Sequence, residues 1–313
     1  MSGRDTMILD FRDPNGKPYV ICTLISVAVM LAASVIFLIY LVVAAPSEAY
    51  VLTTGDEPIG IVYPLVCAAV FVLSLVLLVK DLAKRMKGCP EEEKDARFMR
   101  APASKAGILF SITAFTSLAM VLFSYLIGEE ITEDFISNMD TYEIMVSMMC
   151  AGPEEEFICR LLMIGLPVTL ICLVKGHTNC AKYLFGGFGM SKAALVFLFI
   201  SSVAFGLLHL GEWSIMKFPD TFISGMLFGY VYIQYGIHAS IVMHSSFDLL
   251  ASFDFFFDGA GTFPVVFMSI LGIVLTVRSL LKIRTYIPEN MLHEPFEGSL
   301  IEMWERNRST RAR

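Results

Sequence analysis

Long uninterrupted apolar runs dominate this chain of 313 residues and restrict its fold more than any other feature. Because the hydrocarbon core of a bilayer is about 30 Å thick, a helix needs about 20 apolar residues to cross it. Runs of about this length lie at residues 19–45, 59–79, 106–127, 142–174, 193–210, 219–235, 238–257 and 262–281. We therefore predict an all-α fold, a polytopic membrane bundle of about eight transmembrane helices.

Composition supports this prediction and argues against one class of partner. Hydrophobic residues make up 56% of the chain, charged residues make up 17%, and the mean hydropathy is +0.68. A soluble core does not need so much apolar chain. The net charge of −7 argues against nucleic acid. The seven cysteines lack the spacing of a zinc site or a secreted disulfide framework, so we interpret them as small residues of membrane helices.

Lysine and arginine are concentrated in alternate loops. Residues 80–105, between the second and third runs, are rich in both, and residues 175–192 carry three lysines. The loops after the first and third runs carry neither residue type. Because basic loops stay on the cytoplasmic side, we expect an integral, multi-pass membrane protein with both termini in the cytoplasm.

Charged residues interrupt the fourth apolar run in segment 152–160, which reads GPEEEFICR. Pro153 suits the first position of a helix and glutamates suit its positive end, so we expect a helix to begin here. Glu156 and Arg160 are four apart and would face each other as an ion pair. Glu155 would point about 100° away. At the surface of a soluble protein this would be a capped helix, but ionisable groups inside a membrane indicate function.

Two later runs also carry polar residues at one-turn spacing. Phe205 and His209 lie near the end of the fifth run, and His244 and Asp248 lie in the seventh. Each pair alone is explained by ordinary packing or by an isolated hydrogen bond. Counting from the span boundaries puts His209 in the outer half of the bilayer and His244 in the inner half. Boundaries or tilts must therefore shift for the two imidazoles to meet.

One carboxylate and two imidazoles are compatible with two hydrolytic mechanisms. In the first, Glu155 is a general base for a water molecule, one histidine orients the water and the other stabilises the oxyanion. In the second, Glu155, His209 and His244 hold a divalent metal such as zinc, with water in the open position. The chain has no HExxH-type pair on one helix. The residues leave both mechanisms open and make no cofactor certain.

These residues resemble the CAAX protease and bacteriocin-processing family of intramembrane endopeptidases, which includes the type II CAAX prenyl proteases. The family motifs EExxxR, FxxxH and HxxxN or HxxxD correspond here to Glu155–Arg160, Phe205–His209 and His244–Asp248, in the family order. The resemblance covers about residues 142–257. It implies hydrolysis of a peptide bond in a membrane-associated peptide or protein, such as a prenylated C-terminus or a leader peptide.

The resemblance also implies a role for each motif residue. Glu155 would be the water-activating base, and His209 would position the water. Glu156 and Arg160 would hold the helix in place. His244, together with the residue four positions later, would stabilise the oxyanion, with or without a metal.

Position 248 departs from the prenyl-protease pattern. Those members of the family tend to have Asn where this chain has Asp248. An ionised Asp cannot donate a hydrogen bond to an oxyanion. Either Asp248 is protonated in its apolar setting, or it orients His244 without touching the substrate.

The motifs also define the expected organisation of the chain. Residues 1–141 would form three transmembrane helices with a basic cytoplasmic loop, residues 142–283 the catalytic bundle, and residues 284–313 a polar tail. The rival interpretation is a non-catalytic scaffold or immunity protein, or a proton-coupled transporter that uses the same Glu and His residues. A transporter would more often have broken helices in two corresponding halves. The motif residues all follow residue 150, which favours a membrane endopeptidase.

Overall fold

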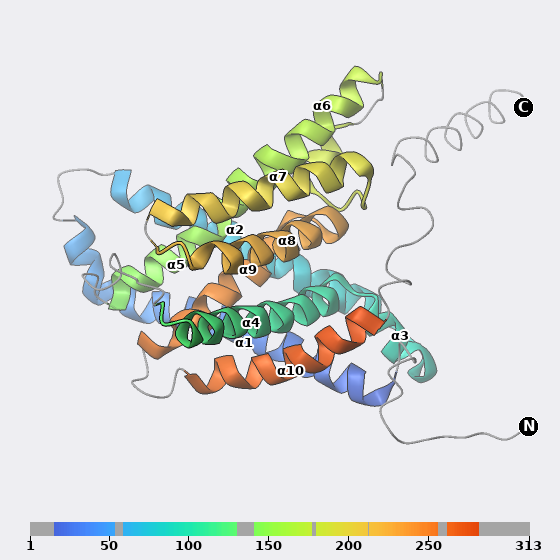
Figure 1. Cartoon of the computed structure of the whole chain (residues 1–313), viewed down its shortest axis with the longest axis horizontal. Helices are drawn as coiled ribbons and strands as arrows, with labels where there is room; N and C mark the ends of the chain where they lie inside the picture. The colour runs from blue at the N-terminus through green and yellow to red at the C-terminus, as the bar shows by residue number, and fades with distance from the viewer. Residues whose placement is uncertain are drawn as a thin grey trace, which may run out of the picture.

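The chain folds into an all-helical bundle in a computed structural model that describes residues 16–53, 59–129, 141–176, 180–211, 213–255 and 262–281. No strand occurs among these residues. The helices are α1 (Lys17–Thr53), α2 (Ile59–Met86), α3 (Lys94–Met99), α4 (Pro102–Leu126), α5 (Thr141–Glu156), α6 (Leu166–Val174), α7 (Lys192–Leu208), α8 (Lys217–Tyr235), α9 (Ile237–Ala251) and α10 (Thr262–Leu281). The predicted all-α membrane bundle is therefore confirmed (Figure 1).

Six helical segments of the described chain are long and apolar enough to cross a membrane. They are Lys17–Tyr40, Val62–Met86, Pro102–Leu126, Thr141–Val174, Lys192–Gly211 and Thr262–Leu280. The prediction of eight spans is not confirmed, because the sixth and seventh predicted runs correspond to α8 and α9. Helix α9 has 15 residues, or about 22 Å, which is shorter than the hydrocarbon core. Helix α8 has Lys217 and Asp220 in its first turn.

The fourth apolar run forms one continuous helical segment, Thr141–Val174. It consists of α5, a π-helix over Phe157–Gly165 and α6. The expected helix start at Pro153 is wrong, since Pro153 lies inside α5. Proline removes one backbone hydrogen bond of the helix. One turn later the backbone hydrogen bonds change to the wider i to i+5 pattern of a π-helix. The glutamates of segment 152–160 therefore lie in the interior of a helix, away from a helix terminus.

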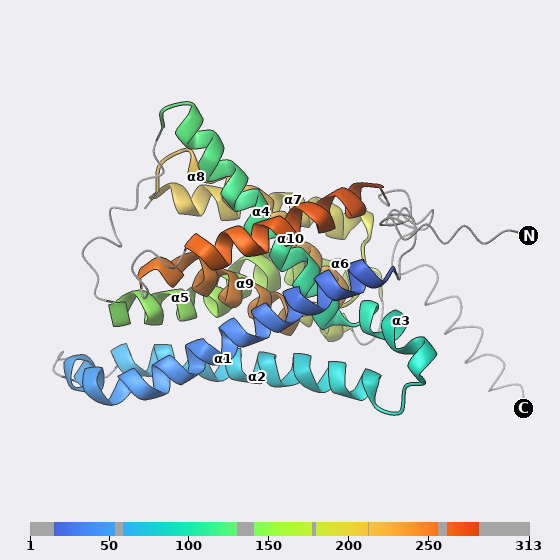
Figure 2. The same ribbon diagram turned by 90° about the horizontal axis from the view of Figure 1, so that it is seen from below.

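Helix α9 lies at the centre of the bundle and contacts α1, α2, α4, α5 and α8 (Figures 1 and 2). Its polar side chains must therefore find partners on neighbouring helices. Ser246 shows the pattern: its hydroxyl lies 2.8 Å from that of Ser34 on α1 and donates to the carbonyl of Met30 at 3.1 Å. Helix α9 is thus enclosed by the surrounding helices.

One pair of cysteines differs from the interpretation as unpaired helix residues. Cys172, in α6, is joined by a disulfide to Cys180, which begins the short 3₁₀ segment Cys180–Phe185. Only eight positions separate the two, so the bond joins α6 to the next described segment of the chain. The five other cysteines lie in the described chain as free thiols.

Gly152 lets α5 approach α9 closely. A Cβ atom at position 152 would lie 2.1 Å from the Oγ of Ser245 and 3.1 Å from its backbone nitrogen. The two helices can therefore touch only because position 152 lacks a side chain.

We expect Gly152→Ala to lower stability by about 1–3 kcal/mol, because added volume in a packed contact forces the backbones apart. Thermal unfolding in detergent measures the change. The Gly152→Ala/Ser245→Ala double variant should recover part of the loss, because it removes the closest atom. Gly211→Ala is the control, since a Cβ there meets nothing within 4 Å. An equal effect of the two alanines would contradict the close contact.

Candidate functional site

His244 on α9 is the meeting point of three carboxyl groups. Its Nδ1 lies 2.9 Å from Oε1 of Glu156. Its Nε2 lies 3.6 Å from Oε2 of Glu155 and 3.5 Å from Oδ2 of Asp248. Two of these carboxyl groups come from α5, and the third lies one turn further along α9. Helices α5 and α9, which carry two of the three motifs, therefore meet at one imidazole.

Glu156 is fully enclosed and has three partners. Its carboxylate pairs with Nε of Arg160 at 3.3 Å, and both side chains are 0% exposed. Ser240, one turn before His244 on α9, donates its hydroxyl to the same carboxylate. The ion pair expected from the four-residue spacing is present. The bonds to His244 and Ser240 were not expected, and they link α5 directly to α9.

Arg160 is in turn fixed by α7. Its Nη1 donates to the Ser201 hydroxyl at 3.0 Å, and its guanidinium lies 5.0 Å from the centre of the Phe205 ring. Ser201 donates back to the carbonyl of Cys159 at 2.5 Å. The contact from Nε to Glu156 is an ion pair by distance but lacks the direction of a hydrogen bond. We treat it as electrostatic, which needs no particular angle.

Aromatic rings hold the orientation of His244. The ring of Phe228, on α8, stacks on the imidazole with 4.3 Å between centroids and 20° between planes. The ring of Phe205, on α7, meets it edge-on at 5.7 Å. With Nδ1 bonded to Glu156, the ring has little freedom to turn. Its Nε2 therefore points at Glu155 and Asp248.

His209 lies beside this cluster and contacts Phe205. It follows the last residue of α7, and its ring is 4.7 Å from that of Phe205. Its Nδ1 donates to the Phe205 carbonyl at 2.7 Å, because a carbonyl only accepts. In the neutral ring Nε2 is then an acceptor. The structure thus brings both histidines against one phenylalanine ring, which reconciles the different depths estimated from the sequence.

The junction at Nε2 of His244 can hold a proton. Glu156 is paired with Arg160 and accepts from Nδ1, so Nδ1 carries a hydrogen. If the ring were neutral and the carboxyl groups of Glu155 and Asp248 were both ionised, three acceptors would converge. A proton on Nε2 or on one carboxyl group relieves this repulsion. Oδ2 of Asp248 has no hydrogen-bond partner among the described residues, so it can take part in such sharing.

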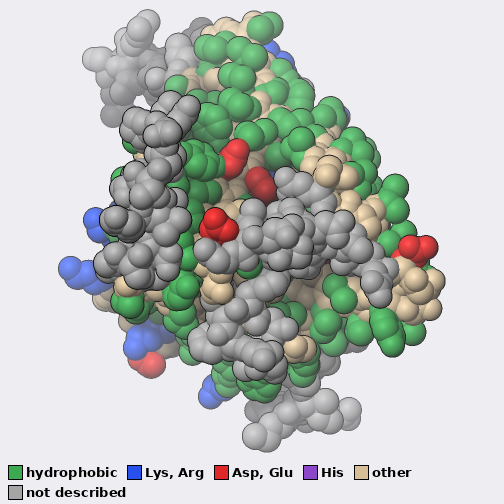
Figure 3. Space-filling model, turned by 90° about the vertical axis from the view of Figure 1, so that its left-hand side faces the viewer, with side chains coloured by type: hydrophobic (Ala, Val, Ile, Leu, Met, Phe, Trp, Pro, Cys, Tyr) green, Lys and Arg blue, Asp and Glu red, His purple; other side chains and the backbone are tan. Residues whose placement is uncertain are grey.

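Glu155 is the carboxyl group of the cluster that reaches open space. Its side chain is 31% exposed, against 16% for Asp248 and 0% for Glu156. It lines a groove of about 570 Å³ between α2 and α5. Figure 3 looks onto the end of the bundle where α5 begins, and acidic side chains are visible there in a hollow among hydrophobic ones. Glu155 is therefore accessible from this groove.

A metal finds no ready set of ligands in the part of the chain that the structure describes. No group of three or more His, Cys, Asp or Glu side chains there has the arrangement to hold an ion. The Phe205 ring contacts both histidines of the proposed zinc set, with 4.7 Å between its centroid and that of His209 and 5.7 Å to that of His244. We therefore route no step of the reaction through a metal.

Several residues of the site were missed by the sequence motifs. Ser201 and Ser240 precede Phe205 and His244 by one turn, so the four-residue spacing could have identified both. Phe228 gives no such signal, because it lies on a helix without a motif. Glu154 and Tyr63, which are hydrogen-bonded across the groove, also lie outside the motifs.

The fold and the cluster define the class: an integral membrane protein with a buried carboxylate–histidine site. Residues 137–250 match the model of one family, described as Type II CAAX prenyl endopeptidase Rce1-like. The matched segment contains all three motifs, so the family resemblance is confirmed for this part of the chain. Neither a curated protein nor a solved structure matches the chain.

The different environments of Glu155 and Glu156 predict different effects of substitution on stability. We expect Glu156→Gln to destabilise the fold by about 3–5 kcal/mol, because it leaves the buried Arg160 without its counter-charge. Glu155→Gln is the matched control, since that side chain is partly exposed and is not paired with Arg160. Thermal unfolding of both variants in the same detergent tests this. Equal melting temperatures would show that the buried pair does not stabilise the bundle.

Proposed function

We propose that this protein is an intramembrane endopeptidase in which Glu155 activates a water molecule. The observation that carries the proposal is the contrast between two neighbours: Glu156 is enclosed and fully engaged, whereas Glu155 faces both the groove and His244. A general base must reach the proton that it removes. The match of residues 137–250 to an endopeptidase family supports the same chemistry.

The proposed reaction is the addition of water to a peptide carbonyl. Glu155 takes one proton from water while the oxygen attacks the carbonyl carbon, and the carbonyl oxygen becomes an oxyanion. The Glu155 proton then passes to the amide nitrogen, and the carbon–nitrogen bond breaks. The products are a carboxylic acid and an amine.

His209 would act on the attacking water, and His244 and Asp248 would act on the carbonyl oxygen of the cleaved bond. His209 offers Nε2 as an acceptor for one water hydrogen, because its Nδ1 is bonded to the Phe205 carbonyl. Either His244 or Asp248, whichever holds the proton shared at Nε2, would donate a hydrogen bond to the oxyanion. Donors fixed before the reaction stabilise developing charge strongly. Phe205 and Phe228 hold the His244 ring in the required direction.

We infer the orientation in the membrane from the distribution of charge. Helix α2 begins beside the groove and ends at the basic loop, about 40 Å away. We place the basic end in the cytoplasm and the groove at the opposite face. The Cys172–Cys180 disulfide lies near the basic end, and such bonds are rare in the cytoplasm. The charge bias determines the proposed orientation because it is the sum of many lysine and arginine residues, whereas the disulfide is a single bond.

We expect Glu155→Gln to abolish peptide hydrolysis, with a loss of at least about 10²–10⁴-fold, while the protein stays folded. The amide keeps the shape of the side chain but cannot take a proton. Profiling of peptide termini in membranes that carry the parent or the variant measures the cleavages. Glu92→Gln, at an exposed carboxylate near the basic end, is the control. Identical profiles for parent and Glu155→Gln would favour the scaffold or transporter alternative.

Position 248 tests the oxyanion role. An Asp donates only while it is protonated, and rising pH removes that proton, whereas an Asn donates at every pH. We expect Asp248→Asn to retain most activity and to extend it to higher pH. Asp248→Ala should lose on the order of a hundredfold, the usual effect of removing one oxyanion donor. The pH profiles of the three proteins measure this.

The alternative role of Asp248 gives the opposite result. If the carboxylate acts through its negative charge and orients His244, the Asn variant should lose nearly as much activity as the Ala variant. Asp248 would then be removed from the oxyanion site.

A further inference from the structure

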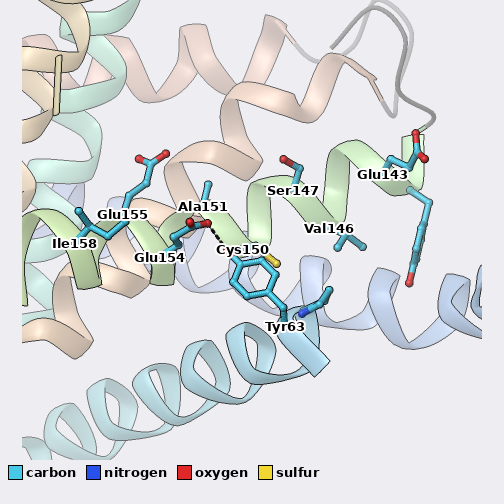
Figure 4. Close-up of a pocket in the computed structure, with 11 residues that line it drawn as sticks. Tyr63, Glu143, Val146, Ser147, Cys150, Ala151, Glu154, Glu155 and Ile158 are labelled. Atoms are coloured by element: carbon cyan, nitrogen blue, oxygen red, sulfur yellow. Dashed lines mark hydrogen bonds between the residues drawn. The ribbon is translucent and has the colours of Figure 1, made fainter. Parts of the chain in front are cut away.

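The groove that leads to Glu155 has one wall from α5 and one from the start of α2. The lining residues recur every three or four positions, from Glu143 on α5 to Ile158 on the following π-helix, and so occupy one face of the continuous helical segment. Tyr63 and Pro64 form the opposite wall. The groove therefore runs along the helix axis and passes the proposed base, and Figure 4 shows residues that line it.

The length of this groove suits a short extended peptide. Glu143 and Glu155 are twelve residues apart on the helix, which corresponds to about 18 Å. An extended chain advances about 3.3 Å per residue, so about five residues span the same distance. A peptide bond beside Glu155 would have its flanking residues between α2 and α5.

The walls of the groove favour a positively charged occupant. Glu143, Glu154 and Glu155 all line it, and none of the described lining residues is Lys, Arg or His. An apolar isoprenoid chain laid against Glu154 and Glu155 would remove their carboxylates from water without offering a polar partner, which is unfavourable. A cationic side chain would offer one.

Tyr63 and Glu154 provide a specific place for that side chain. The Tyr63 hydroxyl donates to the Glu154 carboxylate, and in Figure 4 Glu154 points toward Tyr63 while Glu155 points away from it. The bond fixes one carboxylate oxygen and leaves the carboxylate charge available. The face of an aromatic ring also attracts cations. The two residues thus combine an oriented charge with an aromatic surface. Glu154 immediately precedes Glu155 on α5, so this pair lies next to the proposed base.

We propose that the groove between α2 and α5 binds an extended substrate segment of about five residues, and that Glu154 with Tyr63 selects a Lys or Arg side chain next to the cleaved bond. This rests on the proposed function, because it assigns a substrate class to the same site. Glu154 and Tyr63 are specificity residues in this scheme and take no part in proton transfer.

A binding experiment tests the preference apart from catalysis. The full-length Glu155→Gln variant in detergent is titrated with fluorescent five-residue peptides that carry Lys, its neutral isostere norleucine, or Glu at each position in turn. We expect Lys at one position to improve the dissociation constant about tenfold over norleucine. Adding Glu154→Gln should remove this ratio, and adding Glu154→Lys should reverse it in favour of Glu. Glu92→Gln should leave it unchanged.

A second arm addresses a prenyl occupant and links binding to cleavage. A farnesylated neutral peptide that binds more tightly than the Lys peptide, with no effect of Glu154→Lys, would overturn the inference. A Lys preference that persists in Glu154→Gln would do the same. The ratio of kcat/KM for Lys and norleucine peptides with the parent protein should match the binding ratio. If the Lys preference in binding depends on Glu154 but the parent cleaves no peptide, the proposed function fails while the groove assignment stands.

Discussion

The buried ion pair between Glu156 and Arg160 is the interaction on which the rest of the structure depends. Both side chains are 0% exposed, so neither charge has water as a partner. Removing an ion from water costs several kcal/mol unless a counter-charge and hydrogen bonds replace the solvent. Here the replacements come from other helices. Ser240 and His244 on α9 donate hydrogen bonds to the Glu156 carboxylate, and Ser201 on α7 accepts one from the Arg160 guanidinium. The requirement to neutralise one pair therefore fixes three elements relative to each other.

Three successive glutamates on α5 then occupy three environments, because each residue of a helix turns about 100° from the last. Glu154 faces Tyr63 across the groove, Glu155 reaches both the groove and His244, and Glu156 lies in the protein interior. A single residue of register shift would exchange these environments. The close contact of Gly152 with Ser245 prevents such a shift, because any side chain at that position would clash. The small residue and the buried pair together set the position of Glu155.

The sequence predicted the parts that depend on local spacing. The four-residue interval between Glu156 and Arg160 identified the pair, and long apolar runs identified an all-helical membrane bundle. It failed at Pro153, where the rule for helix starts was applied to a proline that the membrane helix contains. The prediction of eight spans is not confirmed by the structure, since α9 is shorter than the hydrocarbon core and is surrounded by neighbouring helices. Contacts between helices, such as Phe228 on His244, have no periodic signal and needed the fold.

The enclosure of α9 explains how polar chemistry can exist in this bundle. A long helix that faced lipid would need apolar side chains around its whole circumference, whereas a short central helix can carry Ser240, His244 and Asp248 because its neighbours solvate them. The continuous segment Thr141–Val174, in contrast, is longer than the hydrocarbon core, at about 51 Å. Part of this segment must therefore extend past the core, or the segment must tilt within it. Glu155 lies where the long helix passes the short one. Water can therefore follow the groove along α5 to a carboxylate whose other face contacts the fixed imidazole of His244.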